Sequence, residues 1–380
     1  MKLRYGMNPH QTAAPVVPVR PGEVPVRVLN GEPSYINLLD ALNAWQLVGE
    51  ASRALGGQVA AASFKHVSPA GAALAGPVDE AAAELHGVGP AGLGAVTSAY
   101  LRARDADPKS SYGDFAALSH PVDAELAELL ATVVCDGIIA PDYHPGVVER
   151  LGRKKGGRFL VLAADPAYRP PAREARQVYG LRLEQERDQV DLTPELLRPA
   201  AGEELDPAAV TDLLLGLAVL RYTQSNSVCY VRDGVTVGIG AGQQSRVDCT
   251  RLAGAKADLW WLRRHPAVRA LEFRPEVRRQ DRINWQLRHL EGETPAADLL
   301  AAPAPELTDR QRSLWLAGLT DVRFTSDGAL PFRDNVDHAA RHGVTHIAEP
   351  GGSVRSAEVE QACREHGITL ARTGLRLFHH

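Results

Sequence analysis

Two adjacent side chains with acid–base chemistry, Lys65 and His66, end the apolar segment "QVAAASF" and lie within "SFKHVSPAGAA", residues 63–73. An ammonium beside an imidazole disfavours protonation of the imidazole, which leaves a neutral base near neutral pH. Chemistry that takes a proton from a weakly nucleophilic amine needs such a base. The structural alternative is a strand-end lysine that extends to solvent and a histidine that caps a turn expected at residues 69–71.

A second polar stretch is "RYTQSNSVCY", residues 221–230. It contains five consecutive hydrogen-bonding residues: Thr223, Gln224, Ser225, Asn226 and Ser227. Such side chains can satisfy the backbone of an ordinary turn, yet five in a row exceed what one connection needs. The run therefore predicts either a turn or a site that holds a polar ligand by hydrogen bonds.

Two arginines are candidates for anion recognition. Arg246 ends the glycine-rich "VGIGAGQQSR", residues 237–246, whose GxGxG spacing matches neither a dinucleotide fingerprint nor a P-loop. This segment suits recognition of an amide or an anionic group. The chain ends in "LRLFHH", where apolar residues alternate with Arg376. That pattern favours a docked end whose guanidinium reaches a phosphate over a frayed tail.

Composition excludes several classes of function. With 380 residues, 44% hydrophobic and 23% charged, the chain can form two ordinary domains or one large one. A net charge of -4 without a basic run disfavours nucleic-acid binding, and no segment resembles a signal peptide or a membrane span. Four dispersed cysteines favour a reducing cytoplasm. The thirteen histidines show no zinc-binding spacing, so no zinc is expected.

The elements that must position these side chains alternate between helix and strand, which predicts a layered α/β fold. In residues 37–55, Leu38, Leu42, Trp45 and Val48 recur at helical spacing, and the Asp-Gly of "YVRDGVTVG" predicts a tight hairpin turn. The second half repeats the order of the first. We expect related α/β units at residues 1–165 and 206–380, a connector at 166–205, and a helical insert at about 250–320.

Along its whole length the chain resembles AICAR transformylase, the formyltransferase half of a bifunctional purine-biosynthesis enzyme. Ten segments carry the resemblance, in order from residue 3 to residue 380: "LRYGMNPHQT", "SYINLLDALNAWQLV", "SFKHVSPAGAA", "SSYGDF", "CDGIIAP", "RYTQSNSV", "IGAGQQSR", "RLAGAKA", "PFRDN" and "LRLFHH". The resemblance implies duplicated cytidine-deaminase-like α/β units without zinc. It also implies formyl transfer from 10-formyltetrahydrofolate to the 5-amino group of AICAR (aminoimidazole carboxamide ribotide), which yields formyl-AICAR and tetrahydrofolate.

Site residues follow from the same resemblance. His66 is expected to take the proton of the poorly nucleophilic amine, while Lys65 keeps the imidazole neutral and helps deliver a proton to the departing folate nitrogen. Asn226 would donate to the developing oxyanion or align the formyl group. The implied substrate-binding residues are Arg4, Tyr5, Asn37, Ser110, Gly113, Arg246 and Arg376, the last with phosphate as its partner. Asp136 and Asp334 would lie on the folate side.

The resemblance also implies a homodimer whose active sites use both subunits, and a monovalent cation, potassium in some relatives, near Thr223, Ser225 and Ser227. Ala329 and Leu330 replace two family phenylalanines, which predicts looser ligand stacking. Relatives carry an N-terminal domain that closes formyl-AICAR to inosine monophosphate. Since this chain starts almost at the first shared motif, we expect a stand-alone transformylase or an excised domain, served by a separate cyclohydrolase.

Two other functions compete with this one. A formyltransferase that uses formate and ATP would need a phosphate loop, and the sequence contains none. A non-catalytic sensor of AICAR would need no base, so Lys65, His66 and Asn226 argue against it. Folate binding would separate the transformylase from the sensor, and ATP dependence would separate it from the formate-using enzyme.

Overall fold

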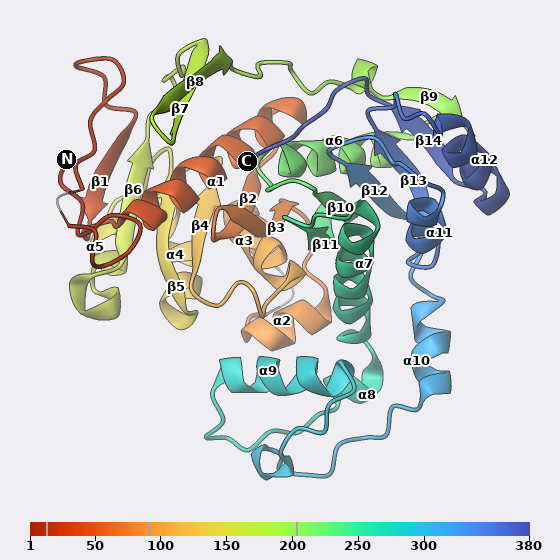
Figure 1. Cartoon of the computed structure of the whole chain (residues 1–380). Coiled ribbons are helices and arrows are strands. Elements are labelled where there is room, and N and C mark those ends of the chain that lie inside the picture. Colours follow the sequence, from red (N-terminus) through yellow and green to blue (C-terminus); the bar gives the residue numbers. More distant parts are fainter. Residues whose placement is uncertain (13, 90–91, 203) are drawn as a thin grey trace.

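A central mixed sheet organises the chain, and the predicted α/β class is confirmed (Figure 1). The computed structural model describes residues 1–12, 14–89, 92–202 and 204–380. Within these ranges twelve strands form one sheet in the order β1-β6-β5-β4-β2-β3-β11-β10-β12-β13-β14-β9. Its strands are β1 (Val26–Asn30), β2 (Ala60–Lys65), β3 (Ser68–Leu74), β4 (Asp114–Leu118), β5 (Cys135–Ala140), β6 (Leu160–Ala164), β9 (Arg198–Ala201), β10 (Val228–Arg232), β11 (Val235–Gly240), β12 (Val322–Ser326), β13 (Val344–Glu349) and β14 (Thr369–Arg372).

The sheet contains the same arrangement of strands twice. In the first half β2 pairs antiparallel with β3 and β4, and β4, β5 and β6 run parallel. In the second half β10 pairs antiparallel with β11 and β12, and β12, β13 and β14 run parallel. The halves meet where β3 pairs antiparallel with β11, so the strand order reads outwards in the same way on both sides. The likeness to cytidine deaminases and the domain boundaries stay predictions.

Helices cover both faces of the sheet and enclose a separate core on each. One face is packed by α1 (Tyr35–Ala54) and α6 (Pro207–Arg221), the two helices that precede β2 and β10. The other carries α3 (Ala95–Ala106) on β3 and α7 (Arg246–Leu262) on β11. The remaining helices of the layers are α2 (Glu80–His86), α4 (Ala124–Thr132), α5 (Val147–Gly152), α11 (Asp334–Ala340) and α12 (Ser356–His366). None of the helices in the described ranges has the length and apolar character that a membrane crossing requires.

Close backbone contact between sheet and helix depends on glycine in both halves. A Cβ at Gly71 of β3 would lie 2.1 Å from the carbonyl oxygen of Ala103 in α3. A Cβ at Gly238 of β11 would lie 2.1 Å from the carbonyl oxygen of Ala253 in α7. Because α7 takes the place in the second half that α3 has in the first, it belongs to the repeated pattern. The helices outside that pattern are α8 (Pro266–Arg269), α9 (Arg279–Leu290) and α10 (Asp309–Leu316), seen below the sheet in Figure 1.

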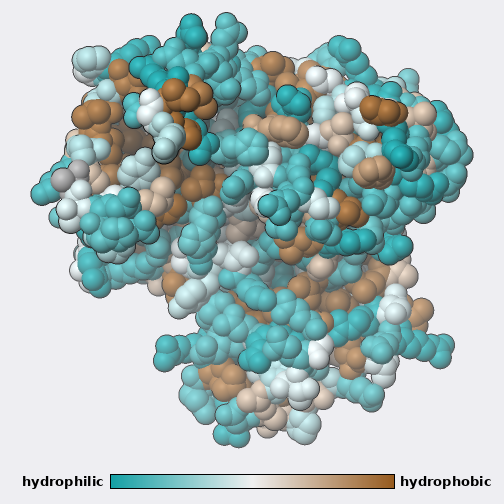
Figure 2. Space-filling model, viewed as in Figure 1, coloured by the Kyte–Doolittle hydropathy of each residue, from teal (hydrophilic) through white to brown (hydrophobic). Residues whose placement is uncertain are grey.

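The connector between the halves contains a two-stranded hairpin, β7 (Arg173–Val178) and β8 (Leu181–Glu186), which stands apart from the large sheet. Its strands are largely exposed to solvent, and so are the side chains of Val178, Tyr179 and Leu181. Figure 2 shows hydrophobic residues gathered at the upper left of this face, in the region of the hairpin and the N-terminal segment. Arg176 of the hairpin donates a 2.8 Å hydrogen bond to the backbone oxygen of His380, at the C-terminal end of the chain.

Candidate functional site

The Lys65–His66 pair lies at a tight hairpin turn between β2 and β3. Lys65 pairs with Ser68, so His66 and Val67 form a two-residue loop. Both have positive φ, 54° and 59°, a conformation that is unfavourable above all for β-branched valine. The predicted turn at residues 69–71 is wrong, because these residues belong to β3. The turn instead lies at residues 66–67 and carries the imidazole at its tip.

A buried carboxylate, missed by the sequence reasoning, holds this turn. Oδ1 of Asp40, in α1, accepts a 2.7 Å hydrogen bond from the backbone N–H of Val67. Burial raises the pKa of Asp40, and the hydrogen bonds from the Val67 and His66 backbone partly oppose the rise. The helical spacing could have revealed this residue. Asp40 lies four residues before Ala44 and seven before Leu47, which places it on the buried side of α1.

The Lys65 ammonium is fixed by the loop that precedes β4. Its Nζ donates a 2.5 Å hydrogen bond to the carbonyl oxygen of Tyr112. In the same loop the Asp107 carboxylate accepts from the Ser110 backbone N–H at 2.9 Å and from its hydroxyl at 2.7 Å. Gly113 has φ of 75°, which favours glycine. Lys65, His66 and Ser110 thus line one cavity of about 330 Å³, together with apolar residues of β3, β11 and α7.

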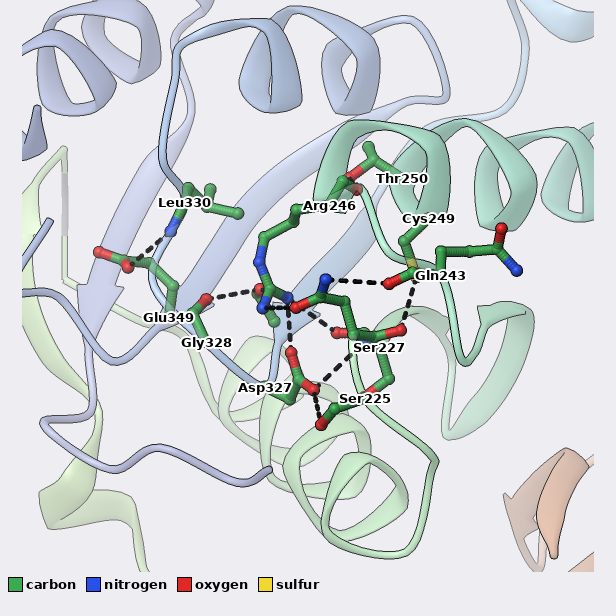
Figure 3. A network of polar contacts seen from close by, with 12 residues as sticks. Ser225, Ser227, Gln243, Arg246, Cys249, Thr250, Asp327, Gly328, Leu330 and Glu349 are labelled. Carbon is green, nitrogen blue, oxygen red and sulfur yellow. Dashed lines mark hydrogen bonds and ion pairs between the residues drawn. The ribbon is translucent and has the colours of Figure 1, made fainter. Parts of the chain in front are cut away.

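Arg246 belongs to a second polar cluster, which Figure 3 shows, and a hydrogen bond links Asn226 to it. Arg246, the first residue of α7, is 7% exposed. Its Nη2 donates to Oδ1 of Asn226 at 2.7 Å, and its Nη1 lies 2.5 Å from Oδ1 of Asp327. The Asn226 amide nitrogen donates to the carbonyl oxygens of Gln243 at 2.9 Å and Gln244 at 3.1 Å. Both amide hydrogens of Asn226 therefore have partners before any ligand binds.

Asp327, also missed from the sequence, joins three segments of this cluster. Its Oδ2 accepts from the Ser225 hydroxyl at 2.5 Å and from the Ser227 backbone at 3.0 Å. Its carbonyl oxygen accepts from the Leu377 backbone N–H at 2.8 Å, and the His379 backbone N–H donates to the Ser225 hydroxyl at 3.1 Å. The predicted docked C-terminus is therefore confirmed.

Arg376 and Arg246 line a second cavity, of about 430 Å³. The guanidinium of Arg376 lies 4.8 Å from the ring centroid of Phe378 and is exposed. Ala329 lines the same cavity, whereas Leu330 is 1% exposed and packs in the hydrophobic core. Of the two positions at which the family has phenylalanine, only the one occupied by Ala329 therefore faces this cavity.

The remaining predicted site residues line neither cavity. Arg4 donates a 3.0 Å hydrogen bond to the Tyr5 hydroxyl in the N-terminal segment. Asn37 forms a capping box with Ser34 at the start of α1. Asp136, at the start of β5, pairs with Lys155. Asp334, the first residue of α11, accepts a 2.8 Å hydrogen bond from the Asn335 side chain.

Thr223, Ser225 and Ser227, predicted to bind a cation, belong to the segment that follows α6. The Thr223 hydroxyl donates to the Val219 carbonyl oxygen at 2.7 Å. The Ser227 hydroxyl is buried and has no hydrogen-bond partner in the described part of the chain. Across residues 1–12, 14–89, 92–202 and 204–380, no group of three or more His, Cys, Asp or Glu side chains could hold a metal ion.

Taken together, the chain presents an acid–base pair at one cavity and two guanidinium groups at another. The first can take a proton from a bound nucleophile, and the second can hold a phosphate or carboxylate. The segment from Ala241 to Arg246 runs from one cavity to the other, since Ala241 lines the first and Arg246 the second.

Comparisons with known proteins point to one family. The family model described as AICARFT/IMPCHase bienzyme matches residues 1–256. The bifunctional purine biosynthesis protein PurH of Roseobacter denitrificans is 34% identical over 383 residues, which cover 100% of this chain and 59% of that protein. PurH of Brucella ovis is 32% identical over 381 residues, 100% of this chain and 58% of that protein. The chain thus spans less than two thirds of the length of these relatives.

Proposed function

The chain belongs to the AICARFT/IMPCHase bienzyme family, and from that premise we propose that it transfers a formyl group from 10-formyltetrahydrofolate to the 5-amino group of AICAR. A bond forms between the amine nitrogen and the formyl carbon, and the bond from that carbon to N10 of the folate breaks. The amine proton leaves and N10 gains one. The products are formyl-AICAR and tetrahydrofolate.

The observation that carries the proposal is the Lys65–His66 pair beside a cavity. His66 reaches it from the tip of the β2–β3 turn, and Lys65 is held next to it by the Tyr112 carbonyl. In the proposed reaction His66 accepts the amine proton, and Lys65 helps to deliver a proton to the departing folate nitrogen. Ser110 lines the same cavity and supports substrate binding there.

The nucleotide phosphate is assigned to Arg376. Arg246 already has a buried carboxylate partner in Asp327, whereas Arg376 is exposed and lines the second cavity. Asn226 would then act through Arg246, whose guanidinium it contacts, or turn its amide towards the formyl oxygen once substrate binds. Asp136 and Asp334 are kept as the folate-side residues, and Arg4, Tyr5, Asn37 and Gly113 as further AICAR contacts.

A homodimer with shared active sites accounts for the separation of these groups. The catalytic pair and the phosphate arginines line different cavities in one chain, yet one AICAR molecule would have to reach both kinds of group. A second copy that brings its arginine cavity against the first copy's Lys65–His66 turn would complete the site.

Potassium fits the oxygen-rich cluster after α6. The side chains available there are hydroxyls and one carboxylate, oxygen ligands that suit a hard cation, and the buried Ser227 hydroxyl lacks a partner in the described ranges. Thr223, Ser225 and Ser227 would hold the ion with Asp327 as the charged group. The cation would supply positive charge that keeps the 223–227 segment in place.

The test is an assay with purified protein, AICAR and 10-formyltetrahydrofolate, in which tetrahydrofolate formation is followed by absorbance. An added cyclohydrolase consumes the product and draws the reaction forward. The His66→Ala variant should lose roughly 100-fold or more in rate, as expected for a general base, with little change in AICAR affinity. His144→Ala, an exposed histidine outside both cavities, is the matched control.

Full turnover by His66→Ala would refute the base assignment. If the wild type binds AICAR but shows no turnover, the chain is a nucleotide-binding protein and the proposed enzyme activity is refuted. Turnover that required formate and ATP in place of the folate would identify a different formyl donor.

A further inference from the structure

We infer that Lys256, from the second half of the chain, is a positioning residue for Lys65. It acts through Asp107 and the 107–113 loop, which together set where the Lys65 ammonium lies in the first cavity. The inference deepens the proposed function and rests on it, because it assigns a further residue to that reaction.

The first step of the connection is an ion pair between the two halves. Lys256 lies in α7, and its Nζ is 3.1 Å from Oδ2 of Asp107, the residue that ends α3. The two side chains are 29% and 12% exposed. A pair that is largely withdrawn from water is screened less than one at the surface, so it can hold its geometry.

Asp107 then fixes the loop. Its carboxylate accepts both the backbone N–H and the hydroxyl of Ser110, and its carbonyl oxygen accepts from the Ser111 N–H at 3.0 Å. Burial would raise the pKa of Asp107, but Lys256 and the Ser110 hydrogen bonds lower it below its ordinary value. The carboxylate therefore stays charged at neutral pH and keeps both sets of contacts.

The loop in turn holds the ammonium of the catalytic pair. Tyr112 offers its carbonyl oxygen to Lys65 Nζ, and it lies two residues after Ser110. A lysine ammonium sits on a flexible four-carbon stem, so its position depends on the acceptor that holds it. Lys256 also lines the same cavity as Lys65 and His66. A direct contact of Lys256 with substrate is therefore the alternative that the experiment must separate.

The same loop offers a matched control. Lys109 forms an ion pair with Glu291 at 2.9 Å, and the two side chains are 56% and 32% exposed. This pair also connects the loop to the second half of the chain. Here, however, the loop supplies the ammonium and the second half supplies the carboxylate of Glu291. Within the described residues that carboxylate accepts hydrogen bonds from Lys109 alone, so it does not hold the loop backbone. Exposed pairs of this kind contribute little.

The experiment compares Lys256→Met, Lys256→Arg and Lys109→Met in the formyl-transfer assay, with hydrogen exchange of the peptide that covers residues 107–113 as a readout independent of activity. Lys256→Met should lower kcat by about 10-fold, since small misplacement of a reacting group costs rate, with KM for AICAR and for the folate unchanged. In the same variant, hydrogen exchange of the amides in residues 107–113 should become faster. Lys256→Arg should restore most of kcat, and Lys109→Met should match the wild type.

A rise in KM at unchanged kcat would overturn the inference and make Lys256 a substrate-binding residue. Equal losses in Lys256→Met and Lys109→Met, or loop exchange that Lys256→Met leaves unchanged, would also overturn it. A wild-type protein without formyl transfer would refute the proposed function instead, while the exchange measurement would still test whether Lys256 orders the loop.

Discussion

His66 presents its imidazole from a backbone position with φ of 54°, and Asp40 bonds the backbone of the residue that follows. The proposed site draws on side chains from distant parts of the chain. Asp327 lies 81 residues from Arg246, and Asp107 lies 149 residues from Lys256. Residue type and spacing singled out Lys65 and His66 at the first cavity and Arg246 and Arg376 at the second. They could not reveal these buried partners, because the partners meet only when segments far apart in the sequence fold together.

Arg376→Ala should weaken binding of the AICAR nucleotide by roughly 10-fold or more, because a charge-assisted hydrogen bond contributes about 1.5–3 kcal/mol. Binding of the AICAR riboside, which lacks the phosphate, should not change. Titration calorimetry with both ligands measures the difference, and Arg310→Ala, an exposed arginine of α10, is the control. Equal affinity of the wild type for nucleotide and riboside would remove the phosphate role from Arg376.

At the scale of elements, the two hairpin turns of the sheet illustrate what sequence can predict. The Asp-Gly turn between β10 and β11 is confirmed, with φ of 52° at Asp233 and 70° at Gly234. The turn between β2 and β3 escaped prediction because His-Val has no preference for positive φ. Pro69 and Gly71 suggested a later turn, but Pro69 sits at an irregularity of the pairing and Gly71 is required by close contact with α3.

Val67→Gly should raise the melting temperature. A β-branched residue in the left-handed region costs of order 1–3 kcal/mol, and glycine removes that cost at a smaller entropic penalty. Thermal unfolding measures the shift. Val19→Gly makes the same chemical change at an exposed residue without positive φ, and it should leave the melting temperature unchanged or lower it. A loss of stability in Val67→Gly would show that the surrounding contacts relieve the strain.

At the scale of the molecule, the halves join through a short strand contact that depends on a side chain. The described pairing of β3 with β11 is Ala73 with Val235. Next to it the Thr236 hydroxyl accepts from the Ala72 backbone N–H at 3.0 Å and donates to its carbonyl oxygen at 3.2 Å. At the middle of the sheet, the Thr236 hydroxyl thus takes the place of one pair of backbone hydrogen bonds between β3 and β11.

Thr236→Val should destabilise the protein by about 1–3 kcal/mol, because it leaves buried backbone groups of Ala72 without partners while it keeps the side-chain shape. Thr211→Val, at an accessible position of α6 whose hydroxyl donates to Pro207, should have a small effect. Urea unfolding of both variants measures the difference. Equal stability of Thr236→Val and wild type would mean that the junction closes without the hydroxyl.

If the active sites are shared between subunits, two impaired variants should complement each other when they are assayed at an AICAR concentration well below KM. Mixed after reversible unfolding, His66→Ala and Arg376→Ala should recover up to about one quarter of wild-type activity, because half of a random mixture is heterodimer with one intact site of two. Each variant alone, carried through the same procedure, is the control. A mixture no more active than its components would place the complete site within one chain.

The internal repeat gives the chain two hairpin turns at equivalent places in its two halves. A doubled α/β unit begins with two equivalent turns, and here they have diverged: one carries the relaxed Asp233-Gly234, and the other the strained His66-Val67. The unit without the Lys65–His66 pair has a turn whose residues favour its backbone conformation. The other unit has a turn that carries the imidazole at its tip in a backbone conformation that its residues disfavour. Exchange of the two dipeptides between the turns would therefore measure, within one protein, how much stability the chain loses by placing His66-Val67 at such a turn.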